Sequence, residues 1–372
     1  MSAEVLSRDA LNRALLDRQL LLRRAPLPEG EARAGRVIGT VEHLAGLQAQ
    51  APFPPYYGLW SRLEGFRPED LAGLLLDRSV VRIALMRGTI HLVSARDCLL
   101  LRPLVQPVLD RAVAVLGRQL EGVDREALAA AGRDLLEQRP LTFSELGTQL
   151  AERWPGCPVN ALAQTVRAAV PLVQVPPRAV WGRAGQAAHT TAESWLGRPL
   201  DAGATLDQLV TRYLAAFGPA TVRDIQAWSG LTRLGEVVNQ LRPGLRTFRD
   251  EQGAELFDLP DAPRPAPDTP APVRLVAEFD NLILSHADRT RVISEANRKR
   301  LYSKNGIFPG TVFVHGYAAG IWQLDRSRTA AVLTIEPFGP LARRDRDAVA
   351  GEGERLLGFA APGVPGHDIR FA

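Results

Sequence analysis

The chain has 372 residues, of which 46% are hydrophobic and 23% charged, a balance typical of globular proteins that excludes an intrinsically disordered chain. This length exceeds what one ordinary hydrophobic core organises, so we expect roughly two to four modules. The net charge of +4 excludes a wholly basic surface, but it allows a basic stripe that faces a polyanion.

The first predicted unit covers residues 1–95, where a helical pattern gives way to a strand-like one. We expect helices near 5–23 and 37–47 and from Pro68 to Leu76, followed by a hairpin at 80–93. Helices followed by a hairpin are typical of a winged helix, so this segment is a candidate for that module.

Gln48 and Gln50 stand where the second of these helices is expected to end. Side chains two residues apart point about 200° away from each other on a helix but the same way on extended backbone, so the pair converges only if the helix has ended. Pro52 disfavours helical backbone for the residue before it, and Pro54 and Pro55 are expected to prevent the helix from resuming. Two neutral carboxamides can orient a water or bind a base edge, but they are too weakly basic to remove a proton. Glutamines near a helix end are also an ordinary surface pattern, so the pair alone does not identify a site.

Residues 139–150 and 218–229 form an internal repeat, in which a proline is followed by a threonine and then by an acidic residue. Thr142 and Thr221 are therefore predicted to cap the N-termini of two short helices. After each copy come a second helix, a short strand and a glycine-bearing hairpin. This order is typical of a winged helix, which predicts two further modules of that kind.

The expected fold class is α+β, with three tandem winged-helix modules followed by an antiparallel, β-rich C-terminal module that could close into a barrel. In chain order the predicted units are residues 1–95, 96–200 and 201–260, a stiff proline-rich linker at 261–272, and the C-terminal module at 273–372. A long helix from Arg96 to Leu120 is expected to connect the first unit to the second. His315 and Gly316 are predicted to form a tight turn between two strands of the last module.

A basic segment in the C-terminal module holds the only two lysines of the chain, while all other basic residues are arginines. Its cations are Arg298, Lys299, Arg300 and Lys304, and they surround Tyr302. Cations grouped around an aromatic side chain fit contact with a DNA backbone together with an inserted or stacking ring. The alternative is a solvated loop, and the clustering of both lysines favours DNA.

Other polar residues are weaker candidates for DNA contact. Arg87 is expected to meet a phosphate, whereas a histidine on a wing strand, as His91 is, more often belongs to the core or to a cap than to a catalytic site. His286 and Asp288 could form a polar pair at the DNA or could join the edge of the sheet. Asp280 is interpreted as a turn cap rather than a general base. The remaining candidate DNA-binding residues are Arg289 and Arg291.

Several functional classes lack support in the sequence. Cys98 and Cys157 have no metal-ligating residue at ligand spacing, so we expect a reducing compartment and no metal. Without an apolar leader or a run of about 18 apolar residues, we expect a cytoplasmic, nucleoid-associated protein that does not enter membranes. P-loop, dinucleotide, G-x-S-x-G and H-E-x-x-H patterns do not occur, so nucleotide hydrolysis and redox chemistry are not supported and no cofactor is expected.

Three segments give the chain a likeness to a known family. They are Gln48-Ala49-Gln50 after an apolar helix, M-R-G-T-I-H-L-V at Met86–Val93, and E-F-D-N-L-I-L-S-H-A-D-R-T-R at Glu278–Arg291. With them the chain resembles the AlkZ-like family of winged-helix DNA glycosylases, and the resemblance spans most of its length. Because that family carries a Gln-x-Gln motif as its catalytic signature, the resemblance implies that Gln48 and Gln50 are catalytic.

The resemblance implies a monofunctional glycosylase acting on double-stranded DNA that carries bulky or cross-linked N-alkylated purines. Alkylation at N7 or N3 makes the purine cationic, so it leaves as a neutral base without a general acid. Oriented carboxamide oxygens could then stabilise the sugar cation and aim a water at C1′. No lysine lies near the glutamines, so a lyase step through a Schiff base is not expected. We expect a monomer that serves DNA repair and self-resistance to a DNA-alkylating natural product.

Two other functions remain open at this point. A non-enzymatic winged-helix DNA-binding protein, such as a transcriptional regulator, would have the same modules but would not depend on the two glutamines. A protein that sequesters a DNA-alkylating toxin would bind the free compound without DNA.

Overall fold

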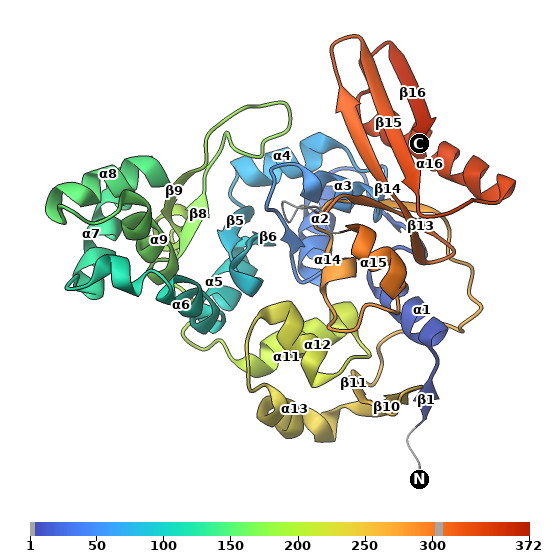
Figure 1. Cartoon of the computed structure of the whole chain (residues 1–372), viewed down its shortest axis with the longest axis horizontal. Helices are drawn as coiled ribbons and strands as arrows, with labels where there is room; N and C mark the ends of the chain where they lie inside the picture. The colour runs from blue at the N-terminus through green and yellow to red at the C-terminus, as the bar shows by residue number, and fades with distance from the viewer. Residues whose placement is uncertain (1–3, 302–307) are drawn as a thin grey trace.

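A computed structural model describes residues 4–301 and 308–372 of the chain, and it has the mixed α+β fold that the sequence predicts. The chain begins with β1 (Val5–Leu6) and α1 (Arg8–Arg18), which pack against later parts of the molecule. Figure 1 shows the green second unit at one end, the yellow third unit below the blue first unit, and the orange-red sheet of the C-terminal module rising at the other end.

The first unit has the order helix, strand, helix, helix and hairpin. Its elements are α2 (Ala32–His43), β3 (Leu47–Gln48), α3 (Pro54–Trp60), α4 (Pro68–Leu76), β5 (Val80–Ala84), η1 (Met86–Gly88) and β6 (Ile90–Ser94), with β2 (Ala25–Pro26) parallel to β4 (Leu63–Glu64). The short strand β3 pairs antiparallel with β6, and β6 pairs with β5. The helix expected at 37–47 therefore ends before Gln48, and the glutamine lies on a strand.

One expectation about this segment is wrong. Pro54 and Pro55 do not keep the chain out of helical backbone, because α3 begins at Pro54. The first residues of a helix donate no intrahelical hydrogen bond, so a missing N–H costs nothing there.

The second unit repeats the same order. Its elements, with the connecting helices before them, are α5 (Ala95–Leu104), α6 (Gln106–Ala114), η2 (Gly117–Leu120), α7 (Arg125–Gln138), β7 (Leu141–Thr142), α8 (Phe143–Arg153), α9 (Val159–Ala169), β8 (Leu172–Gln174), β9 (Ala188–Thr191) and α10 (Ala192–Leu196). The prediction of a single helix from Arg96 to Leu120 is wrong, because the helix is interrupted at Val105, between α5 and α6. Pro107, in the first turn of α6, lacks the N–H that a continuous helix would need.

Strand pairing joins the first two units. β5 pairs with β8, so a six-stranded sheet of order β3-β6-β5-β8-β9-β7 runs through both. The two units therefore share one sheet, with β3 at one edge.

The third unit comprises α11 (Leu206–Phe217), α12 (Val222–Ser229), α13 (Gly235–Leu241), η3 (Arg242–Gly244), β10 (Arg246–Asp250) and β11 (Glu255–Asp258). Ala220 bridges to Phe257, and the N-terminal strand β1 adds to β10 in parallel. The predicted helix caps are confirmed, because the hydroxyls of Thr142 and Thr221 accept hydrogen bonds from the backbone N–H groups of Glu145 and Asp224.

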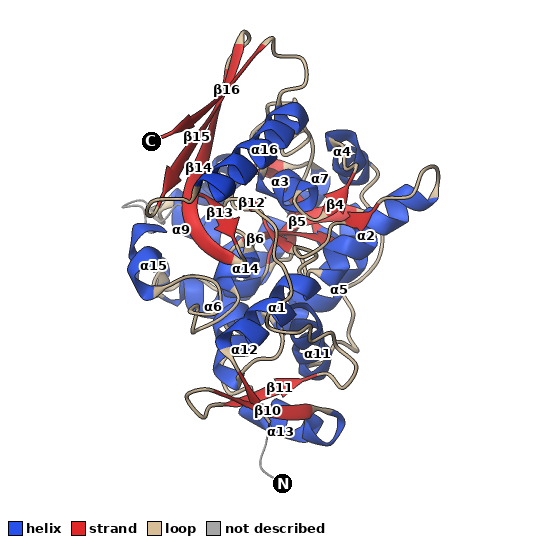
Figure 2. Ribbon diagram, turned by 90° about the vertical axis from the view of Figure 1, so that its right-hand side faces the viewer, coloured by secondary structure: helices blue, strands red, loops and turns tan. Residues whose placement is uncertain are grey.

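The C-terminal module is built on a sheet of order β12-β13-β14-β15-β16. Its elements are β12 (Arg274–Val276), α14 (Asn281–Leu284), α15 (Glu295–Leu301), β13 (Gly310–Val314), β14 (Tyr317–Arg326), β15 (Ala330–Pro337), α16 (Arg343–Ala360) and β16 (Gly366–Phe371). Figure 2 shows α16 lying against this sheet. The predicted turn is confirmed, with φ of 52° at His315 and 88° at Gly316.

The suggested barrel is not formed by the described residues. β12 and β16 are the two edges of the sheet, and β16 runs parallel to β15 rather than antiparallel. The cause is α16, which follows β15 in the sequence and returns the chain to the starting end of that strand. β16 therefore runs in the same direction as β15.

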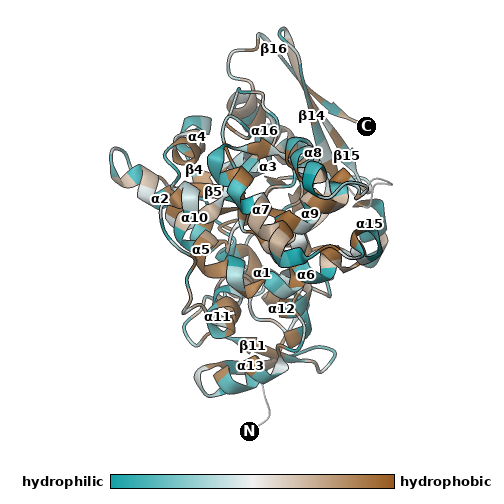
Figure 3. Cartoon of the chain, turned by 90° about the vertical axis from the view of Figure 1, so that its left-hand side faces the viewer, coloured by the Kyte–Doolittle hydropathy of each residue, from teal (hydrophilic) through white to brown (hydrophobic). Residues whose placement is uncertain are grey.

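One hydrophobic core connects the units. It includes Leu15 of α1, Val93 of β6, Leu214 of α11, Leu282 of α14 and Phe313 of β13. Figure 3 shows hydrophobic (brown) and hydrophilic (teal) stretches side by side on the helices. Within the described residues, no helix is both long and apolar enough to cross a membrane.

Candidate active site

Gln48 lies where the first unit, the third unit and the C-terminal module meet. The residue is 8% exposed, and its Oε1 accepts a hydrogen bond of 2.6 Å from Nη2 of Arg87. Arg87 also donates to the carbonyl of Trp228 on α12, at 2.6 Å, and to Oδ1 of Asn281 on α14, at 3.3 Å. A single guanidinium therefore ties Gln48 to two distant parts of the chain.

The local backbone aims Arg87 at this junction. The residue stands in the tight turn between β5 and β6, with φ of 56°, in the left-handed region that costs a non-glycine residue about 1–2 kcal/mol. Burial and the nearby Arg289 lower the pKa of Arg87 to about 10, which leaves it protonated at neutral pH. The Gln48 carboxamide is consequently oriented by a cation.

Gln50 is exposed and is held by the same hairpin, at β6. Its Oε1 accepts a hydrogen bond of 3.1 Å from the backbone N–H of Ile90. Between the two glutamines, Ala49 donates to the carbonyl of Ile90 at 2.7 Å, while the buried Arg82 donates to the carbonyls of Ala49 and Ala51 at 2.6 and 3.3 Å.

These partners also settle which end of each carboxamide faces the protein. A guanidinium and a backbone N–H can only donate, so the oxygens of Gln48 and Gln50 must face them. Each oxygen keeps a second lone pair, and each amide nitrogen keeps its donors for other partners.

A small cavity of about 10 Å³ adjoins Gln48, which is room for about one water molecule. Its lining includes Gln48, Gly58 of α3, Arg62, Glu278 and Asp280. A Cβ added at Gly58 would lie 2.7 Å from a side-chain carbon of Leu47, so the absence of a side chain there lets α3 approach β3.

Two charged residues of this lining form a buried ion pair. Arg62 donates to both carboxylate oxygens of Asp280, at 2.8 and 2.9 Å. Asp280 also accepts a hydrogen bond from the N–H of Leu282 at the start of α14, so its predicted capping role is confirmed. The pair fixes the segment that carries Glu278 against the first unit.

The family model described as "DNA glycosylase AlkZ-like" matches residues 41–359, a range that starts just before β3 and ends within α16. The chain belongs to the AlkZ-like family of DNA glycosylases. The solved DNA glycosylase AlkZ of Streptomyces sahachiroi is similar in fold, with a TM-score of 0.77 over 99% of this chain and 100% of that chain at 20% sequence identity. The chain has no match among curated protein sequences. As a member of this family it is a DNA glycosylase, and its partner is DNA.

The two predicted DNA-binding histidines of this AlkZ-like protein are buried. Nδ1 of His91 hydrogen-bonds to the carbonyl of Thr89 at 3.1 Å, and burial and Arg87 lower its pKa to about 3. Nε2 of His286 lies 3.1 Å from the carbonyl oxygen of Phe217, and its Nδ1 lies 2.9 Å from Oγ of Ser285. Burial, and to a lesser extent the positive charge of Arg291, lowers the pKa of His286. Both rings are therefore neutral at pH 7 and have partners within the protein.

Some of the predicted DNA-binding cations have protein partners. Arg291 is buried and donates to the carbonyl of Pro219 at 2.9 Å. Arg298 pairs with Glu295 at 2.9 Å. Arg300 donates to the carbonyl of Phe338 and lies 3.5 Å from Glu336. Lys299 is exposed on α15, Arg289 lies near Arg87, and Lys304 falls outside the described residues.

Sequence reasoning missed four side chains at the candidate site. Arg62, Arg82 and Gln19 lack any local pattern that distinguishes them from surface residues. Glu278 does have a signal, since it opens one of the three family-like segments, but only the fold brings it to the cavity beside Gln48. Among the described residues, no group of three or more histidine, cysteine or acidic side chains could hold a metal ion.

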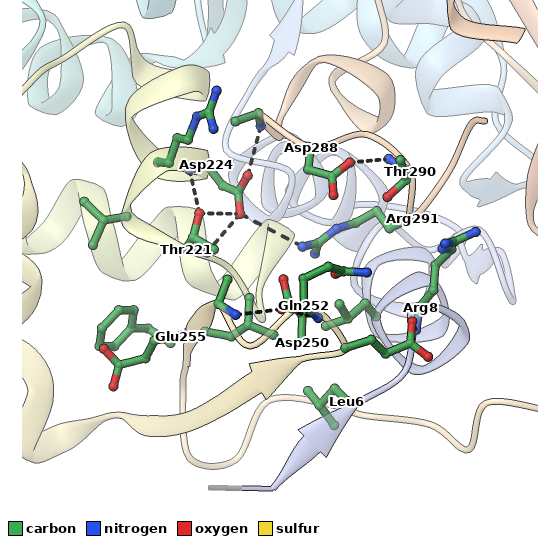
Figure 4. Close-up of a pocket in the computed structure, with 18 of the residues that line it drawn as sticks. Leu6, Arg8, Thr221, Asp224, Asp250, Gln252, Glu255, Asp288, Thr290 and Arg291 are labelled. Atoms are coloured by element: carbon green, nitrogen blue, oxygen red, sulfur yellow. Dashed lines mark hydrogen bonds and ion pairs between the residues drawn. The ribbon is translucent and has the colours of Figure 1, made fainter. Parts of the chain in front are cut away.

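A larger cavity of about 590 Å³ lies between α12, the β10–β11 hairpin and the segment before Arg291, as Figure 4 shows. It shares no lining residue with the cavity at Gln48. Two of its charged groups have partners within the protein, since Arg242 pairs with Glu255 at 2.8 Å and the carboxylate of Asp224 accepts from the backbone N–H of Thr221 at the start of α12.

Proposed function

We propose that this DNA glycosylase hydrolyses the N-glycosidic bond of cationic N-alkylated purines, and that Gln48 and Gln50 position the attacking water. The observation that carries the proposal is the hydrogen bond from Arg87 that orients Gln48 beside a cavity with room for about one water. Gln50 follows two residues later, just beyond β3, and the backbone N–H of Ile90 orients its carboxamide oxygen.

The leaving group explains why carboxamides suffice. A purine alkylated at N7 or N3 already carries positive charge, so it departs as a neutral base and needs no general acid. The remaining work is to place a water at C1′ and to stabilise an oxocarbenium-like sugar. The free lone pairs of the two glutamine oxygens can accept hydrogen bonds from such a water.

We propose that the enzyme is monofunctional and that its substrates are bulky or cross-linked adducts in double-stranded DNA. A lyase step needs an amine that forms a Schiff base with C1′. The only lysines are Lys299, on α15, and Lys304, both far in sequence from the glutamines. Gln48 lies on β3, an edge strand of the six-stranded sheet. No further strand of that sheet therefore stands between Gln48 and a bulky adduct.

The test is single-turnover release of base from DNA containing 7-methylguanine and from DNA with a nitrogen-mustard cross-link. Replacing Gln48 or Gln50 with Ala should lower the rate by on the order of 10- to 1,000-fold, the loss expected for one oriented polar group at a transition state. Exposed Gln138, at the end of α7, is the matched control, and Gln138→Ala should release base at the native rate.

DNA affinity should change little in these variants. The thermal midpoint should change little in Gln50→Ala but should fall in Gln48→Ala, because the buried Arg87 then loses a hydrogen-bond acceptor. A non-enzymatic DNA-binding protein would bind DNA in the same way but release no base. If the Gln48 and Gln50 variants both release base at the native rate, the assignment of the water-positioning residues is wrong.

A further inference from the structure

Glu278 brings a carboxylate to the cavity that Gln48 lines. The residue lies in the short segment between β12 and α14, about 230 positions after Gln48 in the chain. At the next residue, Phe279, the backbone has φ of 57°, a left-handed conformation that costs a non-glycine residue free energy. Such strain is commonly kept where a side chain must be placed for function.

The polar neighbours of Glu278 are already paired with one another. Asp280 is held by both nitrogens of the Arg62 fork. Asn281 donates to the carbonyl of Gly46 at 3.2 Å and accepts from Arg87. Glu278 itself is partly buried and forms no hydrogen bond or ion pair with the residues that the structure describes. Its carboxylate is therefore free to bind a ligand or a water beside the oriented carboxamide of Gln48.

We infer that Glu278 is a further catalytic residue of the proposed glycosylase site, where its carboxylate faces C1′ of the damaged nucleotide and accepts a proton from the water that Gln48 positions. This inference rests on the proposed function. A carboxylate supplies what a neutral carboxamide lacks, namely negative charge near the developing sugar cation and enough basicity to take up a proton. Asp280 cannot fill this role while both of its oxygens are held by Arg62.

The step balances without a further reactant. The bond between C1′ and the purine nitrogen breaks, and its electron pair passes to the cationic base, which leaves neutral. The water oxygen bonds to C1′ and its proton passes to Glu278, which later releases it to solvent. The products are the free alkylated purine, an abasic sugar and one proton.

The environment of Glu278 makes its carboxylate a stronger base than an exposed glutamate. Burial raises the pKa of its carboxyl above the ordinary value. The carboxylate is therefore present above this raised pKa and is lost as the pH falls through it, so the rate should decline on the acid side.

Other titratable groups near Glu278 do not explain such a decline. Burial raises the pKa of the Tyr57 phenol on α3, so this group stays neutral, while Arg62 and Asp280 are paired. His91 has a pKa of about 3 and stays neutral across the working range.

The experiment compares Glu278→Gln, Glu278→Asp and the wild type in single-turnover release of 7-methylguanine between about pH 5 and pH 8. Glu278→Gln should lower the rate about 100- to 10,000-fold, the range for losing a general base, and the remaining activity should not decline on the acid side. Glu278→Asp should keep part of the rate and keep the acid decline. Glu354→Gln is the matched control, because Glu354 is an exposed glutamate on α16 of the same module.

Affinity for the damaged DNA should stay the same or increase in Glu278→Gln, since a negative charge is removed from a DNA-binding site. A Glu278→Gln enzyme with the native rate and the native pH profile overturns the inference and leaves the proposed function intact. A wild-type protein that releases no base from alkylated DNA overturns the proposed function itself. If Glu278→Gln fails to fold, Glu278→Asp provides the test. A Glu278→Asp rate that no longer declines at acid pH would also overturn the inference.

Discussion

The buried ion pair between Arg62 and Asp280 should be the most sensitive point for stability near the candidate active site. The two side chains are 1% and 4% exposed, and two hydrogen bonds of 2.8 and 2.9 Å join them. Replacing Arg62 with Met keeps most of the side-chain volume but leaves a buried carboxylate without its cation. Breaking such a pair from one side costs about 3–5 kcal/mol, so the free energy of unfolding should fall by that amount.

Other partners of Arg62 add to this loss. Its guanidinium also donates to the carbonyl of Gly58 at 3.0 Å and to Oε1 of Gln19 at 3.2 Å. Each hydrogen bond contributes roughly 0.5–1.5 kcal/mol, so the smaller ones do not outweigh the ion pair. The double variant Arg62→Met/Asp280→Leu removes both charges and should be more stable than Arg62→Met alone, because no buried charge then lacks a partner.

Urea unfolding at 25 °C, followed by circular dichroism, measures these differences. Arg33 and Asp70 provide the control, since they form a two-bond pair of 2.6 and 2.7 Å at 13% and 12% side-chain exposure. Their pair is partly solvated, so Arg33→Met should cost less, about 1 kcal/mol. Equal losses in Arg62→Met and Arg33→Met, or a double variant less stable than Arg62→Met, would refute this reasoning.

Two further predictions concern the substrate and the DNA contact. Cationic N7- and N3-alkylpurines should be released, whereas uncharged 8-oxoguanine, hypoxanthine and uracil should not, because no step of the proposed mechanism protonates a neutral base as it leaves. Efficient uracil release in a glycosylase assay would contradict this. Replacing exposed Lys299 with Gln should weaken binding to damaged and undamaged DNA alike and flatten the slope of log affinity against log salt by about 0.9 for one lost phosphate contact. Arg298→Gln, whose cation is already paired with Glu295, should change the slope less, and equal slopes in all three proteins would place α15 away from the DNA.

Local chemistry determined much of the fold from sequence. The caps at Thr142 and Thr221, the turn at His315-Gly316 and the extended backbone at Gln48 follow from side chains within three or four positions of one another. The α+β class and the family follow from patterns that lie within continuous segments. A single stretch of chain contains all the information for such features.

The tertiary structure decided which distant segments each helix and strand contacts. The parallel direction of β16 depends on how α16 returns the chain, and the pairing of β5 with β8 depends on how two units pack. The candidate active site also depends on tertiary structure, because Arg87 comes to Gln48 from a neighbouring hairpin and Glu278 comes from a distant module. Periodicity and propensity describe a residue's own segment, whereas burial and pairing depend on contacts across hundreds of positions, so only the folded chain could bring these three side chains together.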